Sequence, residues 1–205
     1  MIGEIVGASV LGLLSTVALL YKRTQSPPLR AAIACDCGKV QGRVDAPAAT
    51  HLVCYCDDCQ AFAFKVCKGP SSAIDTSGGT DIVQIFPTDV RFSQGLELLR
   101  IGIVTPKTAT LRVFASCCGT PMYNTMQGRA FLGLLTAVIR DGAPLPPVQF
   151  RIMAKFATGP VPCEPTPSSV VSVRFVLNFI VRCILYRGRV EPAPLDLSQP
   201  KTLLA

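Results

Sequence analysis

The chain has 205 residues, of which 49% are hydrophobic and only 16% are charged. This length suits one domain with extensions, and the charged share is low beside the roughly 25% that is usual in soluble domains. The formal net charge is +7, but the 20 lysines and arginines are spread along the chain without a dense basic run, which argues against a nucleic-acid-binding protein.

The first predicted element is an apolar helix over residues 1–23. No charged residue occurs between residues 5 and 21, and Lys22-Arg23 closes the run. A run of this length lies at the short end of the about 17–25 residues that span a bilayer. Glu4 stands where a secretory signal peptide would carry positive charge, and a transit peptide would be rich in arginine. Because basic residues follow the run, we predict a membrane anchor with the remaining chain in the cytosol, and the organelle stays open.

Residues 24–28 include two prolines and predict a short linker. From there to about residue 140, short apolar runs alternate with turn residues such as glycine, proline and aspartate. This spacing is typical of a small all-β domain. We therefore predict a mainly β domain over residues 29–140.

Seven of the ten cysteines lie in three tight clusters inside this predicted domain. The clusters are Cys35 and Cys37, then Cys54, Cys56 and Cys59, and then Cys117 and Cys118. On a strand, Cys54 and Cys56 point to the same face, and a turn at Asp57-Asp58 would bring Cys59 back toward them. Three converging thiolates suit a tetrahedral metal with one free position, and zinc is favoured because it is thiophilic and brings no redox demand.

Two nearby residues have alternative roles. Cys67 could be a fourth ligand of the Cys54, Cys56 and Cys59 site, although a buried thiol is the simpler interpretation. His51, the only histidine, could be catalytic, although we expect an ordinary partly buried histidine. Buried free thiols or disulfides are the alternative to metal sites, and disulfides fit poorly with a domain in the cytosol.

Residues 141–205 predict a proline-rich linker, an apolar helix over 170–186 and an extended, loosely ordered tail. Within the helix, Arg174, Asn178 and Arg182 fall four apart and form one narrow polar stripe. The wide apolar face could pack on the β domain or lie in the membrane interface with its arginines on the headgroups. Crossing the bilayer is disfavoured, because each central arginine costs about 2.5–3.5 kcal/mol.

The cysteine pattern resembles the glutathione-dependent formaldehyde-activating family, which includes the centromere protein V-like proteins. The matching segments lie within residues 29–140, and they look most similar to an uncharacterised sister group. They are Cys35-Asp36-Cys37-Gly38 with Val40 and Gly42, Cys54 to Cys59, the Gly78-Gly79-Thr80-Asp81 turn, Phe114 to Gly119, and the Cys117 to Pro121 stretch.

The resemblance implies a compact two-sheet zinc fold of the β-tent type with two zinc ions. A structural site would take Cys35 and Cys37 with the downstream cysteines, and a functional site would take Cys54, Cys56 and Cys59 near bound glutathione. The family's downstream motif is Phe-Cys-x-x-Cys-Gly, and this chain has Ala115 at the first cysteine. Cys117 would then have to supply the fourth sulfur beside Cys118.

The implied activity is that of a carbon–sulfur lyase acting on adducts of glutathione with an aldehyde. Cys54, Cys56 and Cys59 would be the catalytic zinc site, and glutathione would be a cosubstrate whose thiol pKa the zinc lowers. Candidate auxiliary residues include proton carriers and cations for the glutathione carboxylates. The proton carriers are Tyr55, Asp57 and Asp58, and the cations are Lys65, Lys68 and Arg112. For the three cations a solvated surface charge is the simpler interpretation.

The alternative function is a non-enzymatic zinc module, tethered to the membrane as a scaffold or interaction domain. A fourth protein ligand at the second site would close it and favour this interpretation. An open coordination position would favour the enzyme.

Overall fold

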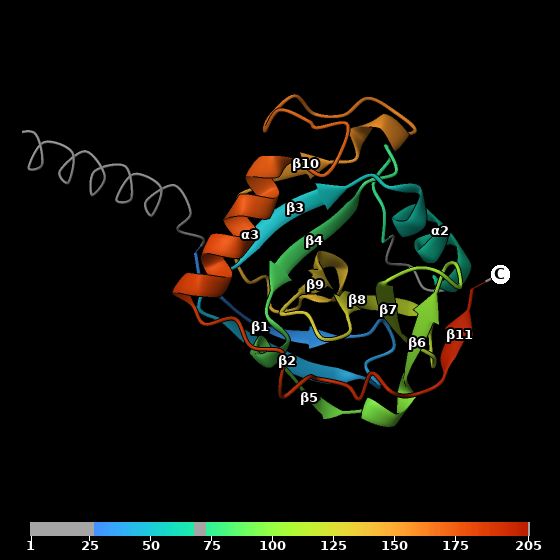
Figure 1. Ribbon diagram of the computed structural model, residues 1–205. Helices are drawn as coiled ribbons and strands as arrows, with labels where there is room; N and C mark the ends of the chain where they lie inside the picture. Colours follow the sequence, from blue (N-terminus) through green and yellow to red (C-terminus); the bar gives the residue numbers. More distant parts are fainter. Residues whose placement is uncertain (1–26, 68–72, 205) are drawn as a thin grey trace, which may run out of the picture.

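The computed structural model of the chain describes residues 27–67 and 73–204, which form a mainly β fold with two sheets and two α-helices (Figure 1). The predicted β class with two sheets is therefore confirmed. The predicted anchor helix over residues 1–23 lies outside the described residues. Among those that are described, no helix has the length and apolar character needed to cross a bilayer.

The smaller sheet is antiparallel with the strand order β1-β2-β5, and the larger sheet has eight strands in the order β10-β3-β4-β9-β8-β7-β6-β11. The smaller sheet consists of β1 (Leu29–Ala34), β2 (Gln41–Ala46) and β5 (Val90–Gln94). The larger sheet consists of β3 (Thr50–Cys54), β4 (Thr80–Ile85), β6 (Leu99–Ile103), β7 (Thr110–Ala115), β8 (Thr120–Met126), β9 (Leu132–Leu135), β10 (Phe150–Ile152) and β11 (Lys201–Leu203).

Helix α2 (Asp57–Val66) follows β3, and helix α3 (Val173–Leu185) lies near the end of the chain. Four short 3-10 helices complete the regular structure: η1 (Pro87–Asp89), η2 (Leu96–Leu98), η3 (Thr136–Val138) and η4 (Ala154–Phe156). The α2 segment was not expected to be helical. Asp57 and Asp58, expected in a turn, instead lie in the first turn of α2, where the helix dipole favours acidic residues.

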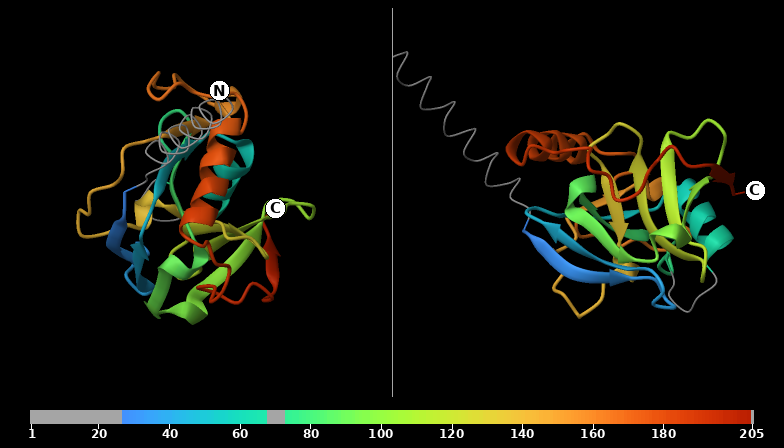
Figure 2. Two further views of the ribbon diagram at one scale, coloured as in Figure 1. Left: turned by 60° about the vertical axis from the view of Figure 1, so that its left-hand side comes forward. Right: turned by 90° about the horizontal axis from the view of Figure 1, so that it is seen from below.

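The main core lies between the two sheets, which face each other in the views of Figure 2. Strand β2 alternates as a half-buried strand should, with Val44 and Ala46 buried and Arg43 and Asp45 exposed. Val44 packs in one cluster with side chains of the larger sheet such as Val113. Each large aliphatic side chain buried there contributes about 1.5–3 kcal/mol, so this interface holds the sheets together.

The larger sheet continues past residue 140, because both of its edge strands come from the C-terminal part of the chain. Strand β10 pairs in parallel with β3, and β11 pairs in parallel with β6. The tail from residue 191 is thus not loosely ordered as predicted: Leu195 and Leu204 are buried, and Lys65 Nζ donates to the Leu204 carbonyl at 2.8 Å. The unpaired backbone groups at the edge of β6 explain why a strand as short as β11 pairs there.

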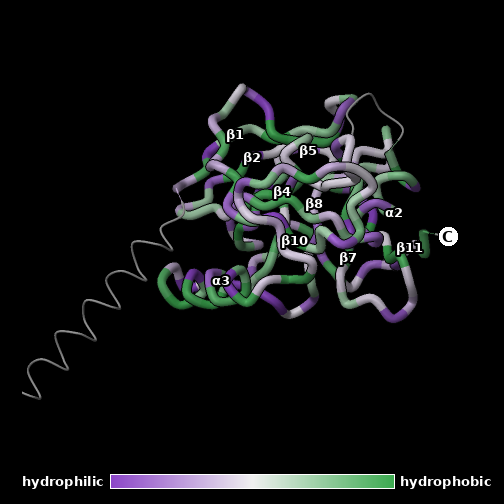
Figure 3. The backbone as a smooth tube through the Cα atoms, turned by 90° about the horizontal axis from the view of Figure 1, so that it is seen from above, coloured by the Kyte–Doolittle hydropathy of each residue, from purple (hydrophilic) through white to green (hydrophobic). Residues whose placement is uncertain are grey.

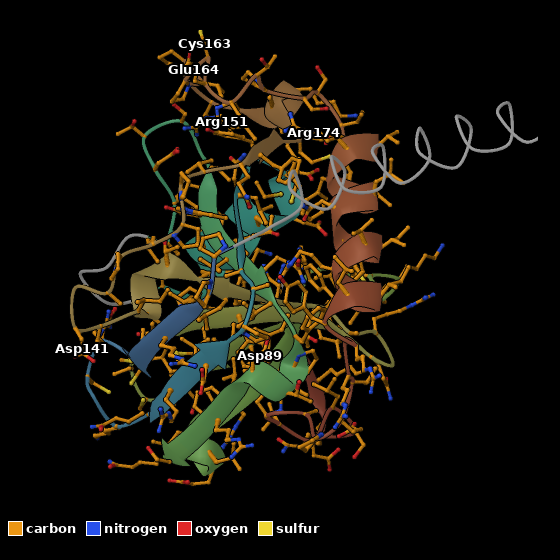
Figure 4. The ribbon with its side chains drawn as sticks, turned by 90° about the vertical axis from the view of Figure 1, so that its left-hand side faces the viewer. Asp89, Asp141, Arg151, Cys163, Glu164 and Arg174 are labelled. Carbon is orange, nitrogen blue, oxygen red and sulfur yellow. The ribbon has the colours of Figure 1, made fainter. Side chains whose placement is uncertain are left out.

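The proline-rich stretch before α3 forms a loop at the β10 end of the molecule. Figure 4 shows Cys163 and Glu164 on this loop close to Arg151, while Asp89 lies in the lower half of the view. Arg151 Nε donates to the Glu164 carbonyl at 3.1 Å, and the Ser168 backbone N–H donates to the Arg151 carbonyl. The loop is therefore attached to β10 through its backbone.

Candidate metal sites

The first cysteine group forms where two tight turns meet. One turn joins β1 to β2 and carries Cys35 and Cys37, and the other joins β7 to β8 and carries Cys117 and Cys118. Each turn contains a glycine in the left-handed region: Gly38 at φ +73° and Gly119 at φ +75°. Only glycine adopts this conformation without strain, which explains why a glycine directly follows each cysteine pair.

The four sulfurs are spaced as a metal site requires. The Sγ–Sγ distances are 3.6 Å from Cys35 to Cys37, 3.9 Å from Cys35 to Cys117, 3.4 Å from Cys37 to Cys117 and 3.8 Å from Cys117 to Cys118. Sulfurs at about 2.3 Å from a tetrahedral zinc would lie about 3.8 Å apart, whereas a disulfide needs about 2.05 Å. This group could hold a metal ion, and its cysteines are free thiols.

Backbone and hydroxyl groups around this first group support thiolate charge. The Val40 N–H donates to Cys35 Sγ at 3.3 Å, and Thr120 Oγ1 lies 3.0 Å from Cys118 Sγ. Thr120 also accepts from the Asp36 N–H at 3.0 Å, and Arg140 Nη2 lies 3.4 Å from Asp36 Oδ1. Such outer contacts fix the orientation of ligands. Local spacing carried no signal for Arg140, because it lies 104 residues from Asp36 in the chain.

The thiol pKa values at this group diverge from one another. Burial and the neighbouring sulfurs raise the pKa of Cys117. Burial alone would also raise the pKa of Cys118, but hydrogen bonds with Thr120 and Cys37 lower it to about 6. Four sulfurs this close cannot all ionise unless a cation compensates their charge.

The second group lies where β3 passes into α2. Cys54 is the last residue of β3, Cys56 is the N-cap of α2, and Cys59 lies in its first turn. The N–H groups of Cys59 and Gln60 donate to the Cys56 carbonyl at 3.1 and 3.2 Å, which folds Cys59 back toward the strand end. The three sulfurs lie within 4.8 Å of one another and could hold a metal ion.

The convergence of these three sulfurs also places negative charge at a helix N-terminus, where the dipole stabilises it. Hydrogen bonds with Cys54 and Cys59 lower the pKa of Cys56 to about 3. The hydrogen bond with Cys56 raises the pKa of Cys54 to about 12. Three sulfurs this close therefore favour the ionisation of one thiol and oppose the ionisation of the others.

The second group is apolar on its inner side and open at Cys56. Cys54 and Cys59 are 8% and 6% exposed, whereas Cys56 is half-buried. They pack with apolar side chains of β3, β4 and β10 and with α3. These side chains are Leu52, Ile82, Phe150, Ile152, Met153 and Phe175.

A buried cation stands near the open side of the second group. The Arg112 side chain is 2% exposed, and its Nη2 donates to Asp58 Oδ2 at 3.3 Å. Its Nε has no partner among the described residues, and its charge lowers the pKa of Cys56 after the effects of the neighbouring sulfurs. Arg112 is thus the one auxiliary candidate that the structure brings to this site with an unused donor.

The other auxiliary candidates lie differently. Tyr55 is fully buried, and its hydroxyl accepts from Arg151 Nη1 at 3.1 Å. Lys65 is bound to the Leu204 carbonyl, Asp57 is exposed, and Lys68 is outside the described residues. None of these contacts brings a Tyr55, Asp57 or Lys65 side-chain group to a cysteine sulfur.

Cys67 and His51 do not join the sulfur groups. Cys67 is the C-cap of α2, and a helix of ten residues separates its ends by about 15 Å, so Cys67 lies far from Cys56. His51 is buried on β3 with its ring nitrogens bonded to Asp81 and the Pro146 carbonyl. Burial lowers the pKa of His51, but these two bonds raise it overall. Its role as an ordinary buried histidine fits this geometry.

Comparisons with known proteins give a family match and a distant structural likeness. The crystal structure of a Rhodobacter sphaeroides protein, solved in structural genomics, shares 17% identity with a TM-score of 0.40, covering 55% of this chain and 90% of that one. A likeness this weak does not establish a shared fold. No curated protein matches the chain.

The family comparison does not support the formaldehyde-activating family that the cysteine pattern resembles. The family that matches instead is described as a family of unknown function, DUF6151. The match runs over residues 29–201, so it includes both cysteine groups, helix α3 and the first residue of β11. The chain therefore belongs to the DUF6151 family.

Proposed function

We propose that the chain is a zinc protein in which the first cysteine group holds a structural ion and the second holds an ion that binds a thiol substrate. The observation that carries this is the difference in ligand number. The first group offers four sulfurs and the second only three, with no further histidine, cysteine or carboxylate joining it among residues 27–67 and 73–204. Closed four-ligand sites are structural, whereas three protein ligands leave a position for substrate.

The residues of the second group suit an anionic thiol such as glutathione. Zinc bound there would supply Lewis acidity that favours the thiolate form of the incoming sulfur. Cys54, Cys56 and Cys59 would hold the ion, and the half-buried Cys56 marks the side from which a ligand can approach. Arg112, whose buried charge acts on Cys56, would add to the positive potential that attracts an anionic ligand.

The reaction we propose is the reversible splitting of a glutathione–aldehyde adduct, a carbon–sulfur lyase reaction. The carbon–sulfur bond breaks, its electron pair leaves with the sulfur as a thiolate, and the adduct hydroxyl loses its proton to water as the carbonyl forms. The reverse direction adds the thiolate to the aldehyde. The glutathione substrate comes from the cysteine pattern's resemblance, and the three-sulfur geometry is what supports a thiol ligand.

X-ray absorption at the zinc edge tests the open site. Two ions held by four and three cysteines would show an average of three and a half sulfur ligands per zinc. Glutathione should raise the average to four, and S-methylglutathione, which lacks a free thiol, should not. Cys56→Ser should abolish the rise, while Cys163→Ser, at an exposed cysteine outside both groups, should preserve it.

An activity assay then separates enzyme from binding protein. Purified protein with zinc should accelerate the equilibration of formaldehyde with glutathione, and Cys56→Ser should not. A protein that carries two zinc ions, yet neither gains a sulfur ligand nor alters this rate, would not be an enzyme of thiol adducts.

A protein that binds two zinc ions but shows neither effect would be a non-enzymatic zinc scaffold. One observation supports this alternative: Cys54 and Cys59 are buried in an apolar cluster, as the ligands of a structural ion commonly are. In that case the second ion would stabilise the junction of β3 and α2 without meeting a substrate.

A further inference from the structure

Helix α3 is inverted relative to an ordinary surface helix. Its polar residues Asn178 and Arg182 are 6% and 0% exposed and face the protein, whereas Val173 and Ile184 are 73% and 71% exposed. Figure 3 shows the helix as a largely hydrophobic coil on the outside of the molecule. The expectation that the apolar face packs on the β domain is therefore wrong: the polar face packs there, and the apolar face is exposed.

Hydrogen bonds fix this orientation. Arg182 Nη1 donates to Thr50 Oγ1 at 2.9 Å and to the Gln84 carbonyl at 3.2 Å, and its Nη2 donates to the Ala48 carbonyl. The Thr50 hydroxyl in turn donates to Asn178 Oδ1 at 3.0 Å. Turning the apolar face inward would break these bonds and leave buried polar groups unpaired, which is costly. The outward apolar face is thus built into the fold.

The exposed face is continuous and has a basic rim. It consists of Val170, Val171, Val173, Val176, Leu177, Ile180, Ile184 and Leu185. Arg174, Arg187 and Arg189 are exposed beside it, and no acidic residue occurs between Glu164 and Glu191. An apolar face flanked by arginines is the pattern of helices that lie in the plane of a membrane surface.

The described chain begins next to this helix. The Ala49 N–H donates to the Pro27 carbonyl at 2.9 Å, and Ala48 and Thr50 on either side of Ala49 both contact α3. Only residues 22–26 separate this point from the uncharged run over residues 5–21. A membrane that held this uncharged run would therefore be within reach of α3.

We propose that the outer face of α3 docks onto the surface of a lipid bilayer with anionic headgroups. Helix α3 has 13 residues and is about 20 Å long, which is shorter than the roughly 30 Å hydrocarbon core, so it lies on the membrane and does not cross it. Its arginines would contact the headgroups.

Two other occupants fit less well. Residues 5–21 carry only Ser9, Ser15, Thr16 and Tyr21 as polar side chains, so a helix formed by them would have no broad polar face. Packed on α3 alone, it would leave its own far side in water. A second copy of the chain would bring two arginine-lined faces together, and like charges at an interface are unfavourable.

Tryptophan fluorescence of the protein with residues 1–205 tests the docking, because this chain has no tryptophan of its own. Ile184→Trp places a single reporter on α3, and Phe64→Trp places a matched one on α2, where Phe64 is 73% exposed. The two helices lie at opposite sides of the molecule (Figure 1). Vesicles of phosphatidylcholine with phosphatidylglycerol should shift the Ile184→Trp emission to the blue, and brominated lipid should quench most of it. Phe64→Trp should change little.

Three outcomes would overturn the proposal. The Ile184→Trp emission could stay unshifted and unquenched while flotation shows the protein on the vesicles. It could already be blue-shifted without lipid, which would mean that residues 5–21 or a second copy covers the face. Brominated vesicles of phosphatidylcholine alone could quench the Ile184→Trp emission equally, which would refute the requirement for anionic headgroups.

Discussion

Cys117 and Cys118 are neighbours in sequence, yet both sulfurs belong to the same group as Cys35 and Cys37. The turn from Ala115 to Gly119 explains this, because Gly119 in the left-handed region donates to the Ala115 carbonyl at 2.8 Å and curls the backbone around the sulfurs. Ala115 itself is a fully buried member of β7 that pairs with Leu99. Adjacent cysteines in the turn thus supply two of the four sulfurs of this group.

Replacing Cys117 tests this arrangement at a single residue. We expect Cys117→Ser to lower the zinc content from two ions per chain to one, because three remaining sulfurs at an exposed turn bind zinc more weakly. Cys163→Ser, at an exposed cysteine outside both groups, should retain two ions. Metal analysis after dialysis measures both, and an unchanged zinc content in Cys117→Ser would rule out adjacent ligation.

Asp89 in η1 carries a testable pH dependence. Burial raises its pKa to about 6, although the Phe86 N–H and the charge of Arg182 act against burial. A carboxyl whose pKa is raised on folding stabilises the protein below its unfolded pKa of about 4, and that contribution is lost as pH rises through about 6. Two pKa units correspond to about 3 kcal/mol as an upper limit, since Asp89 is partly solvated.

We therefore expect the wild type to lose stability relative to Asp89→Asn between pH 4 and pH 7. Urea unfolding of both proteins across this range gives the difference directly. Acid effects shared by the two proteins, including protonation of the cysteine groups, cancel in that difference. A constant difference over the range would contradict the raised pKa.

At the scale of elements, both edge strands of the larger sheet come from segments that sequence patterns did not predict as strands. β10 and β11 have three residues each and pair in parallel with strands far away in the chain. Such short segments carry no period-two signal of their own, and the strand is set by the partner's open edge. Helix α2 was not predicted, because its short apolar run directly after the cysteine cluster fits a strand as well as a helix.

The strand β11 can be tested with two adjacent leucines. Leu204 is 9% exposed and packs with Phe62 and Val66 of α2, whereas Leu203 is 49% exposed. We expect Leu204→Ala to lower the free energy of unfolding by about 2 kcal/mol, the low end for a buried leucine. Leu203→Ala should stay within about 0.5 kcal/mol of wild type. Equal effects in urea titrations would mean that the tail does not pack on α2.

At the scale of the whole molecule, local spacing predicted the two sulfur groups but not which sheets and helices each group connects. The close spacing of Cys54, Cys56 and Cys59 and the glycines at residues 38 and 119 predicted that the sulfurs of each group converge. The expected strand through Cys56 was wrong, because β3 ends at Cys54 and Cys56 is the N-cap of α2. The polar stripe of α3 was also predicted. The inward direction of this polar stripe could not be predicted, because its partners Thr50 and Gln84 lie more than ninety residues away in the chain.

Metal ions bound at the two cysteine groups, as proposed, should hold different parts of the fold together. The first group links the β1–β2 turn of the smaller sheet to the β7–β8 turn of the larger one, whereas the second lies within the larger sheet and its adjoining helix. Loss of metal from the first group should therefore loosen one sheet from the other. Loss from the second should loosen only the start of α2, since local openings follow local contacts.

Hydrogen exchange measured by mass spectrometry distinguishes these effects. Cys37→Ser should increase exchange in β1 and β2 and leave α2 protected. Cys56→Ser should do the reverse, with faster exchange in α2 and little change in β1 and β2. Structural zinc binds with about 10–16 kcal/mol of free energy, so removing it from the first group should also lower the thermal midpoint. If Cys56→Ser loosened β1 and β2 as much as Cys37→Ser does, the first ion would not be the link between the two sheets.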